Sequence, residues 1–200
     1  NPLEMDTKWP DVIAKLKSDP AYTGAFAALF PAGITQETVE SAIATFERTL
    51  LTQNSPFDRW LKGDDNALSA EQKAGYDLFK RVGCVACHQG QNVGGNMFQR
   101  FGVMGDYFGD RGHVTEADYG RFNVTHNESD RFVFRVPSLR NVALTAPYFH
   151  DGSAKTLPDA VGVMVKYQLG RKLEPEQIAS IVAFLGSLTG EVPASANVGG

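Results

Sequence analysis

Two cysteines and a histidine lie close together in the segment Gly83-Cys84-Val85-Ala86-Cys87-His88, and the chain of 200 residues contains no other cysteine. Thiols separated by two residues can form thioether bonds to the two vinyl groups at one edge of a haem. The histidine that follows then lies where its imidazole can bind the iron. The spacing therefore predicts one covalently attached c-type haem, with Cys84 and Cys87 as the attachment points and His88 as an iron ligand.

Two other uses of such a cysteine pair stay open at this point. A disulfide or a thioredoxin-like redox pair needs both thiols but has no need of the adjacent histidine. A zinc site needs two further cysteine or histidine ligands at suitable spacing. The adjacent His88 favours haem over both alternatives.

A haem iron also needs a second ligand, or a vacant position, on the face opposite His88. We favour Met164, which lies 76 positions beyond His88 and just ahead of the last expected helix. A Met/His pair raises the reduction potential and closes the iron to substrates, so this choice predicts a haem that only passes electrons. The six candidates for this second ligand are Met97, Met104, Met164, His113, His126 and His150.

Two amphipathic helices are expected to hold the haem segment. Ser69 and Gln72 form a capping box at the start of a helix that runs towards Gly83. Near the other end, a helix that starts at Pro175 carries apolar residues at helical spacing until Gly190 stops it. Gly75 allows close approach of a second backbone beside Phe79, and Phe184 is a candidate partner. Residues 89–158 are rich in glycine, aromatic and charged residues, and we expect a long insert dominated by loops.

Composition limits the function classes. With 42% hydrophobic and 21% charged residues, the chain has the composition of an ordinary globular protein, and no stretch is apolar for long enough to span a membrane. A net charge of -4 without a basic cluster argues against nucleic-acid binding. Because the first residue is Asn1 and not methionine, we expect a chain that has been processed or that begins within a longer protein.

The first fifty residues are expected to form three helices, over residues 9–16, residues 22–30 and a longer run after Thr35. So few residues in three helices would not bury an independent core. We therefore predict that residues 1–53 are part of another domain and that residues 54–200 form the haem domain.

Four segments resemble the bacterial dihaem cytochrome c peroxidases: residues 44–50 (ATFERTL), 55–59 (SPFDR), 136–152 (VPSLRNVALTAPYFHDG) and 168–170 (QLG). Members of that family have an N-terminal haem domain that reduces hydrogen peroxide and a C-terminal domain whose Met/His haem supplies electrons. The resemblance implies a mainly α fold: a cytochrome c-like electron-transfer domain with long loops, preceded by helices of a second cytochrome c-like domain. The first Cys-x-x-Cys-His motif of the family is missing from this chain.

The resemblance also assigns roles to single residues. Met164 matches the axial methionine of the electron-transfer haem, and Glu4 matches the acidic residue beside the peroxide-binding iron. Thr145 and Pro147 match positions whose backbone carbonyl groups bind calcium between the domains. His150 matches a residue near the electron-transfer haem, which implies an electron-transfer or interdomain role.

Two functions remain as hypotheses. In the first, the chain is the electron-relay portion of a periplasmic peroxidase with two haems in the full-length protein. Such a peroxidase is expected to be a homodimer that takes electrons from a small cytochrome c or cupredoxin and reduces hydrogen peroxide to water. In the second, the chain is a monohaem cytochrome that only carries electrons. We prefer the first, because a free carrier has no use for a partial second domain.

Overall fold

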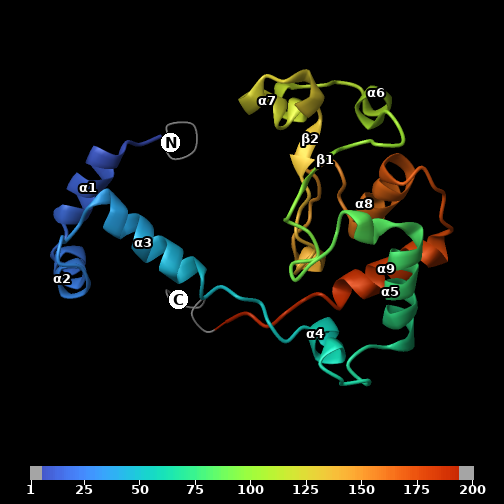
Figure 1. Ribbon diagram of the computed structural model, residues 1–200, viewed down its shortest axis with the longest axis horizontal. Helices are drawn as coiled ribbons and strands as arrows, with labels where there is room; N and C mark the ends of the chain where they lie inside the picture. The colour runs from blue at the N-terminus through green and yellow to red at the C-terminus, as the bar shows by residue number, and fades with distance from the viewer. Residues whose placement is uncertain (1–5, 194–200) are drawn as a thin grey trace. The chain divides into compact units, whose positions relative to one another are not determined.

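The computed structural model describes residues 6–193, in which helices dominate and the one small sheet has two strands, so that the predicted mainly α fold is confirmed (Figure 1). The α-helices are α1 (Trp9–Lys17), α2 (Pro20–Leu29), α3 (Gln36–Glu47), α4 (Pro56–Leu61), α5 (Ala70–Val82), α6 (Tyr107–Arg111), α7 (Phe122–Thr125), α8 (Leu157–Val163) and α9 (Pro175–Gly186). The two strands are β1 (Phe98–Arg100) and β2 (Val133–Arg135). Short 3-10 helices span Cys84–Ala86, Glu116–Tyr119, Glu128–Asp130 and Val142–Leu144, and a π-helix spans Met164–Gln168.

The chain folds as two compact units. The first contains residues 6–51 with residues 192–193, and the second is Thr52–Glu191. The division lies two residues before the boundary expected from the sequence. That the first unit is part of a peroxidatic haem domain stays a prediction.

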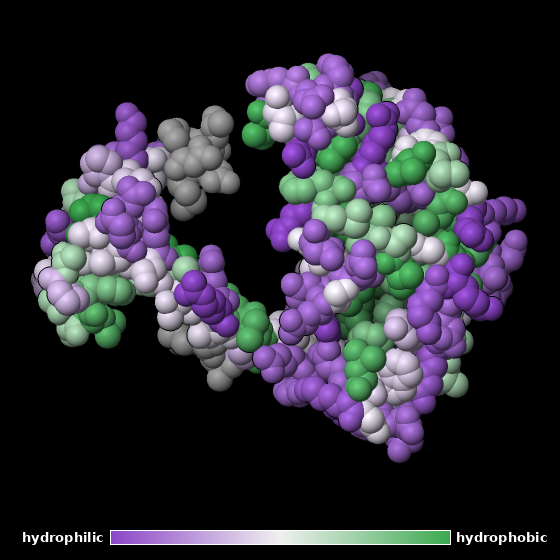
Figure 2. Space-filling model, viewed as in Figure 1, coloured by the Kyte–Doolittle hydropathy of each residue, from purple (hydrophilic) through white to green (hydrophobic). Residues whose placement is uncertain are grey.

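The first unit contains the three expected helices, α1 to α3. Thr35 caps α3, because its hydroxyl accepts a hydrogen bond from the Thr38 N–H group at 3.2 Å. Ile34 and Val39 are buried, whereas Leu29 and Ile43 are 74% and 52% exposed. Figure 2 shows hydrophobic residues at the surface around α2 and at the end of α3. So much exposed apolar surface suits a unit that packs against a larger domain.

The core of the second unit is built on the crossing of α5 and α9. Ser69 caps α5 with Gln72 in the expected capping box, and Gly83 ends the helix in the left-handed region at a φ of 108°. Gly75 makes the crossing possible, because a Cβ atom there would overlap the Ser180 carbonyl group. The Phe79 and Phe184 rings lie 5.2 Å apart, so the expected partnership of these residues is confirmed.

The last helix ends earlier than expected. Helix α9 stops at Gly186 and not at Gly190, and residues 187–189 continue in a tighter turn. The Ser187 carbonyl group accepts a hydrogen bond from the Phe57 N–H group at the start of α4. Gly190 donates its N–H to the Asn141 side chain at 2.9 Å. After Gly186, these hydrogen bonds to other segments take the place of the hydrogen bonds that would continue the helix.

The insert of residues 89–158 is dominated by loops, as expected, but it also contains a ribbon that the sequence did not reveal. Strands β1 and β2 pair antiparallel, with Gln99 opposite Phe134. Helix α8, which begins in the last two residues of the insert, was also not expected. Thr156 caps it, with its hydroxyl accepting the Asp159 N–H at 3.3 Å.

Candidate functional site

A cavity of about 520 Å³ lies within the second unit, between the core helices and the insert. Its volume is in the range of small-molecule and cofactor sites. The walls are mostly apolar, with side chains from α5, the 3-10 helix that follows it, the β ribbon, α8, the π-helix and α9. Its lining includes Cys84, Cys87, His88 and Met164, so the structure brings together the four residues that the sequence singled out for haem binding.

Both cysteines are half-buried, and they form no disulfide bond with each other. They lie on the tight turn after Gly83, where the Cys84 carbonyl group accepts hydrogen bonds from the Cys87 and His88 N–H groups at 3.3 and 2.9 Å. Burial raises the pKa of the Cys84 thiol to about 11. Redox-active cysteines have lowered pKa values, so this environment argues against a thioredoxin-like pair.

His88 is held with one ring nitrogen against the backbone. Its Nδ1 atom lies 3.3 Å from the Val93 carbonyl oxygen. Burial lowers the pKa of the imidazole, against the opposing effect of the Val93 and Pro137 carbonyl groups. A neutral imidazole that donates from Nδ1 leaves Nε2 free as a metal ligand. Gly94 is part of this arrangement, since a Cβ atom there would overlap the Pro137 carbonyl group and lie 3.2 Å from Nδ1.

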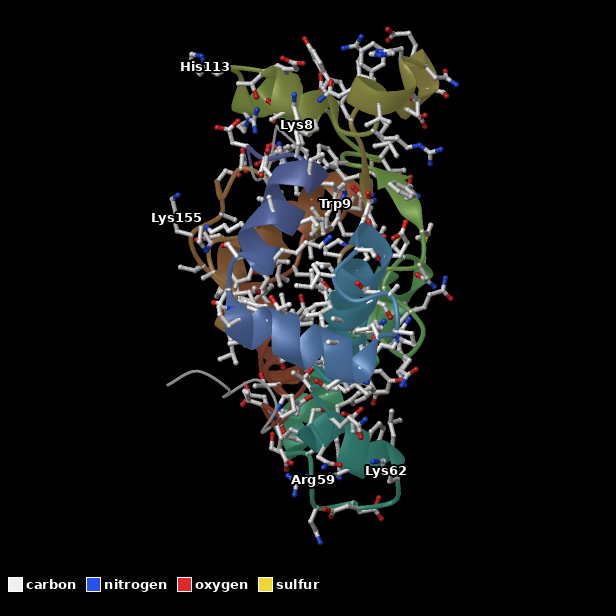
Figure 3. The ribbon with its side chains drawn as sticks, turned by 90° about the vertical axis from the view of Figure 1, so that its left-hand side faces the viewer. Lys8, Trp9, Arg59, Lys62, His113 and Lys155 are labelled. Carbon is white, nitrogen blue, oxygen red and sulfur yellow. The ribbon has the colours of Figure 1, made fainter. Side chains whose placement is uncertain are left out.

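Among the six candidates for the second iron ligand, only Met164 and His150 line the cavity in the described structure. Met104 is 63% exposed. Figure 3 shows His113 at the edge of the second unit with its side chain pointing outward. His150 is engaged elsewhere, because its Nε2 atom lies 2.7 Å from Asp118 Oδ1. Met164 is therefore the best placed candidate, and its role as an iron ligand stays a proposal.

The Asp118 carboxylate is an anchor that sequence reasoning missed. It is 1% exposed, and it accepts hydrogen bonds from Arg111 Nη2 at 2.6 Å and the Thr115 N–H at 2.6 Å. Arg111 also pairs with Asp151 at 2.5 Å. Burial raises the pKa of Asp118, but these donors and His150 outweigh that effect and hold the pKa well below its usual range. The signal in the sequence that could have pointed to Asp118 was its capping pair with Thr115.

His150 contacts the Asp118 carboxylate and also lines the cavity. Its ring stacks on Phe134 with the centroids 4.6 Å apart. Thr145 and Pro147 are exposed residues that line the same cavity. Glu4, the remaining residue expected to act in catalysis, lies outside the described residues.

The residues present fit a c-type haem. Two thiols, a neutral imidazole and a thioether meet at an apolar cavity, and no acidic residue lines its described walls. Arg100 and Arg135 do line it, and guanidinium groups suit the two carboxylates of a haem. Cys84 and Cys87 would hold the haem edge, while His88 and Met164 would bind the iron.

Known proteins resemble both units of the chain. Residues 1–66 match the family described as di-haem cytochrome c peroxidase, and residues 72–189 match the cytochrome c family. The chain is 50% identical over 191 residues to the cytochrome c peroxidase Ccp of Escherichia coli. It is 45% identical over 194 residues to the cytochrome c551 peroxidase of Nitrosomonas europaea. The chain belongs to the bacterial dihaem cytochrome c peroxidase family. Membership implies haem c as the cofactor.

The relatives of this peroxidase family are longer than the chain. The alignments cover 95% and 96% of this chain but 41% of the Escherichia coli protein and 57% of the Nitrosomonas europaea protein. The chain thus spans about half the length of these relatives. A similar solved structure is that of a MauG-like protein associated with microbial copper homeostasis. It has a TM-score of 0.75 and 28% identity, covering 92% of this chain and 62% of that one.

Proposed function

We propose that the second unit is the electron-relay domain of a cytochrome c peroxidase. The observation that carries this proposal is the meeting of Cys84, Cys87, His88 and Met164 at one apolar cavity. Haem bound there supplies an iron that alternates between its ferric and ferrous states. His88 and Met164 would both bind the iron and exclude peroxide from it, so a haem held there would pass electrons and perform no bond-breaking chemistry.

The peroxidase reaction needs a second haem, which we place in the part of the full-length protein that precedes this chain. There, hydrogen peroxide, two electrons and two protons give two waters. Glu4 would move a proton between the peroxide oxygens, as a positioned carboxylate can. The names of the relatives support this reaction, since both are peroxidases.

The remaining roles follow from the family resemblance. We propose a small cytochrome c or cupredoxin as the electron donor, a periplasmic location and a homodimer. Among residues 6–193, no helix is both long and apolar enough to cross a membrane. Calcium would bind the Thr145 and Pro147 carbonyl groups, because such oxygens suit this hard cation. His150 would have an electron-transfer or interdomain role.

A comparison of two proteins tests the proposal. The haem-loaded chain of 200 residues should accept electrons from a reduced small cytochrome c, yet turn over hydrogen peroxide at a negligible rate. The full-length protein should do both. Fast peroxide turnover by the 200-residue chain alone would mean that the His88 haem is itself the peroxidatic one.

A further inference from the structure

The residue proposed as the second iron ligand begins an unusual helical turn. Helix α8 ends at Val163, and Met164–Gln168 continues it as a π-helix. In this turn the Leu169 N–H group donates to the Met164 carbonyl oxygen, five residues back, at 3.2 Å. A π turn is rare because its hydrogen bonding is less favourable than that of an α-helix, and where it occurs it is frequently at a functional site. Something outside the turn must therefore stabilise it.

The side chain of Gln168 attaches the turn to the end of β1 and to the segment that follows it. Its Nε2 atom donates to the Arg100 carbonyl oxygen at 2.8 Å, and its Oε1 atom accepts from the Gly102 N–H at 2.9 Å. One amide group thus bonds to the backbone on both sides of Phe101. Gln168 also lines the cavity that contains Met164.

The backbone supports the same attachment. The Met104 N–H group donates to the Tyr167 carbonyl oxygen at 2.9 Å. A Cβ atom on Gly105 would lie 3.2 Å from the Tyr167 ring. Gly170, at a φ of +60°, leaves room for Met104, whose Cβ would lie 3.1 Å from an added methyl group. Residues 100–105 therefore pack closely along the π turn.

We propose that Gln168 is a positioning residue for Met164. Its two hydrogen bonds hold the turn in its π-helical register, and this register sets the direction in which the Met164 thioether points. A return to regular α-helical bonding would remove one residue from the turn and rotate the side chains about the axis by roughly 100°. This inference rests on the proposed function, in which Met164 binds the iron.

Competition with imidazole tests the proposal in the haem-loaded, full-length protein. Imidazole displaces a methionine ligand, and the loss of the near-infrared charge-transfer band of ferric Met-ligated haem reports that displacement. In Gln168→Leu, imidazole should displace Met164 at about tenfold lower concentration, which corresponds to about 1.4 kcal/mol. Gln168→Glu keeps the acceptor for Gly102 but loses the donor to Arg100, so its affinity for imidazole should fall between those of Gln168→Leu and the wild type.

Tyr167→Phe is the matched control. Tyr167 lies in the same turn, and its hydroxyl donates to Asp110 at 2.9 Å. Removing that hydroxyl breaks the hydrogen bond to Asp110 and leaves the hydrogen bonds of Gln168 in place, so imidazole should bind as in the wild type. Wild-type imidazole affinity in both Gln168 variants would overturn the proposal. An equal gain in imidazole affinity in Tyr167→Phe would also overturn it, because the effect would then reflect a general loosening of the turn.

Met164→Ala separates this inference from the proposed function. If Met164→Ala keeps the near-infrared band, the ligand assignment is wrong, and the role of Gln168 is wrong with it. If Met164→Ala loses the band while the Gln168 variants bind imidazole as the wild type does, the ligand assignment stands and only the positioning role fails.

Discussion

We expect the Cys84 and Cys87 side chains to attach the cofactor permanently. Thioether bonds survive acid and organic solvent, whereas haem that is bound through the iron alone is extracted. Acid-acetone should therefore leave the haem on the wild-type polypeptide, and the double variant Cys84→Ala, Cys87→Ala should hold no covalent haem. Mass spectrometry of the peptide that contains residues 84–88 measures this directly. Free haem in the extract of the wild-type protein would exclude covalent attachment.

We propose that Met164 closes the iron to small ligands. Loss of the thioether in Met164→Ala should lower the reduction potential and let small ligands bind the iron, since the Met/His pair maintains both properties. Potentiometry and cyanide binding check this expectation. Met97→Leu, at a methionine outside the cavity lining, serves as the control and should leave the potential unchanged. If Met164→Ala keeps the wild-type potential, the second ligand is another residue.

At the residue scale, local spacing carried most of what the sequence could predict. The Cys-x-x-Cys-His segment is contiguous, so its chemistry was clear before the fold was known. The second ligand was one of six candidates, because only the folded chain brings Met164 to the cavity and moves His113 to the surface. The capping pair with Thr115 marked Asp118 in the sequence, but its role as an anchor was missed, because its partner His150 lies 32 positions away and that pairing leaves no sequence pattern.

Among the helices and strands, the crossing of α5 and α9 is a contact that a single added methyl group should disrupt. In Gly75→Ala, the added methyl group overlaps the Ser180 carbonyl group, so the helices must separate. We expect the free energy of unfolding to fall by about 2 kcal/mol, as for overpacked cores. Urea unfolding measures it. Gly186→Ala is the control, because its methyl group would have no neighbour within 4 Å. Equal stability of the two variants would show that the crossing tolerates a side chain.

The Asp118 anchor should make the stability of the insert depend on pH. Its folded-state pKa is lowered, so the anchor stabilises the fold fully above the unfolded-state pKa of about 3.9 and loses this effect as the pH falls further. Asp118→Asn should lower the free energy of unfolding by about 3 to 5 kcal/mol at pH 7, and the difference in stability between the two proteins should narrow below about pH 4. Thermal unfolding from pH 3 to 7 checks this.

Asp77→Asn is the control for that experiment, because its pair with Lys80 is exposed and should contribute little. Parallel stability curves for the wild type and Asp118→Asn across this pH range would contradict a charge-dependent anchor.

Capping residues and helical periodicity made the longer helices predictable. Ser69 and Gln72 marked the start of α5, and Pro175 marked that of α9. Strands β1 and β2 are three residues each and pair across more than thirty positions, which is too short and too distant for alternation to reveal. The π turn after α8 depends on bonds to residues 100–104, so no local pattern could predict it.

At the scale of the whole molecule, the account assigns two tasks to two haems. In our proposal, the second unit would bind haem in a closed site that passes electrons, and the rest of the full-length protein would reduce peroxide. The exposed apolar residues of the first unit fit this division, because they suit helices that belong to a larger domain.

Rapid mixing of the fully reduced full-length protein with hydrogen peroxide tests this division most directly. The near-infrared band of the ferric Met164-ligated haem should grow as peroxide is consumed, because the electrons of the His88 haem are needed to complete the reduction. In Met164→Ala the band should be absent from the start, which identifies its source. Complete consumption of peroxide while the His88 haem stays reduced would contradict the relay.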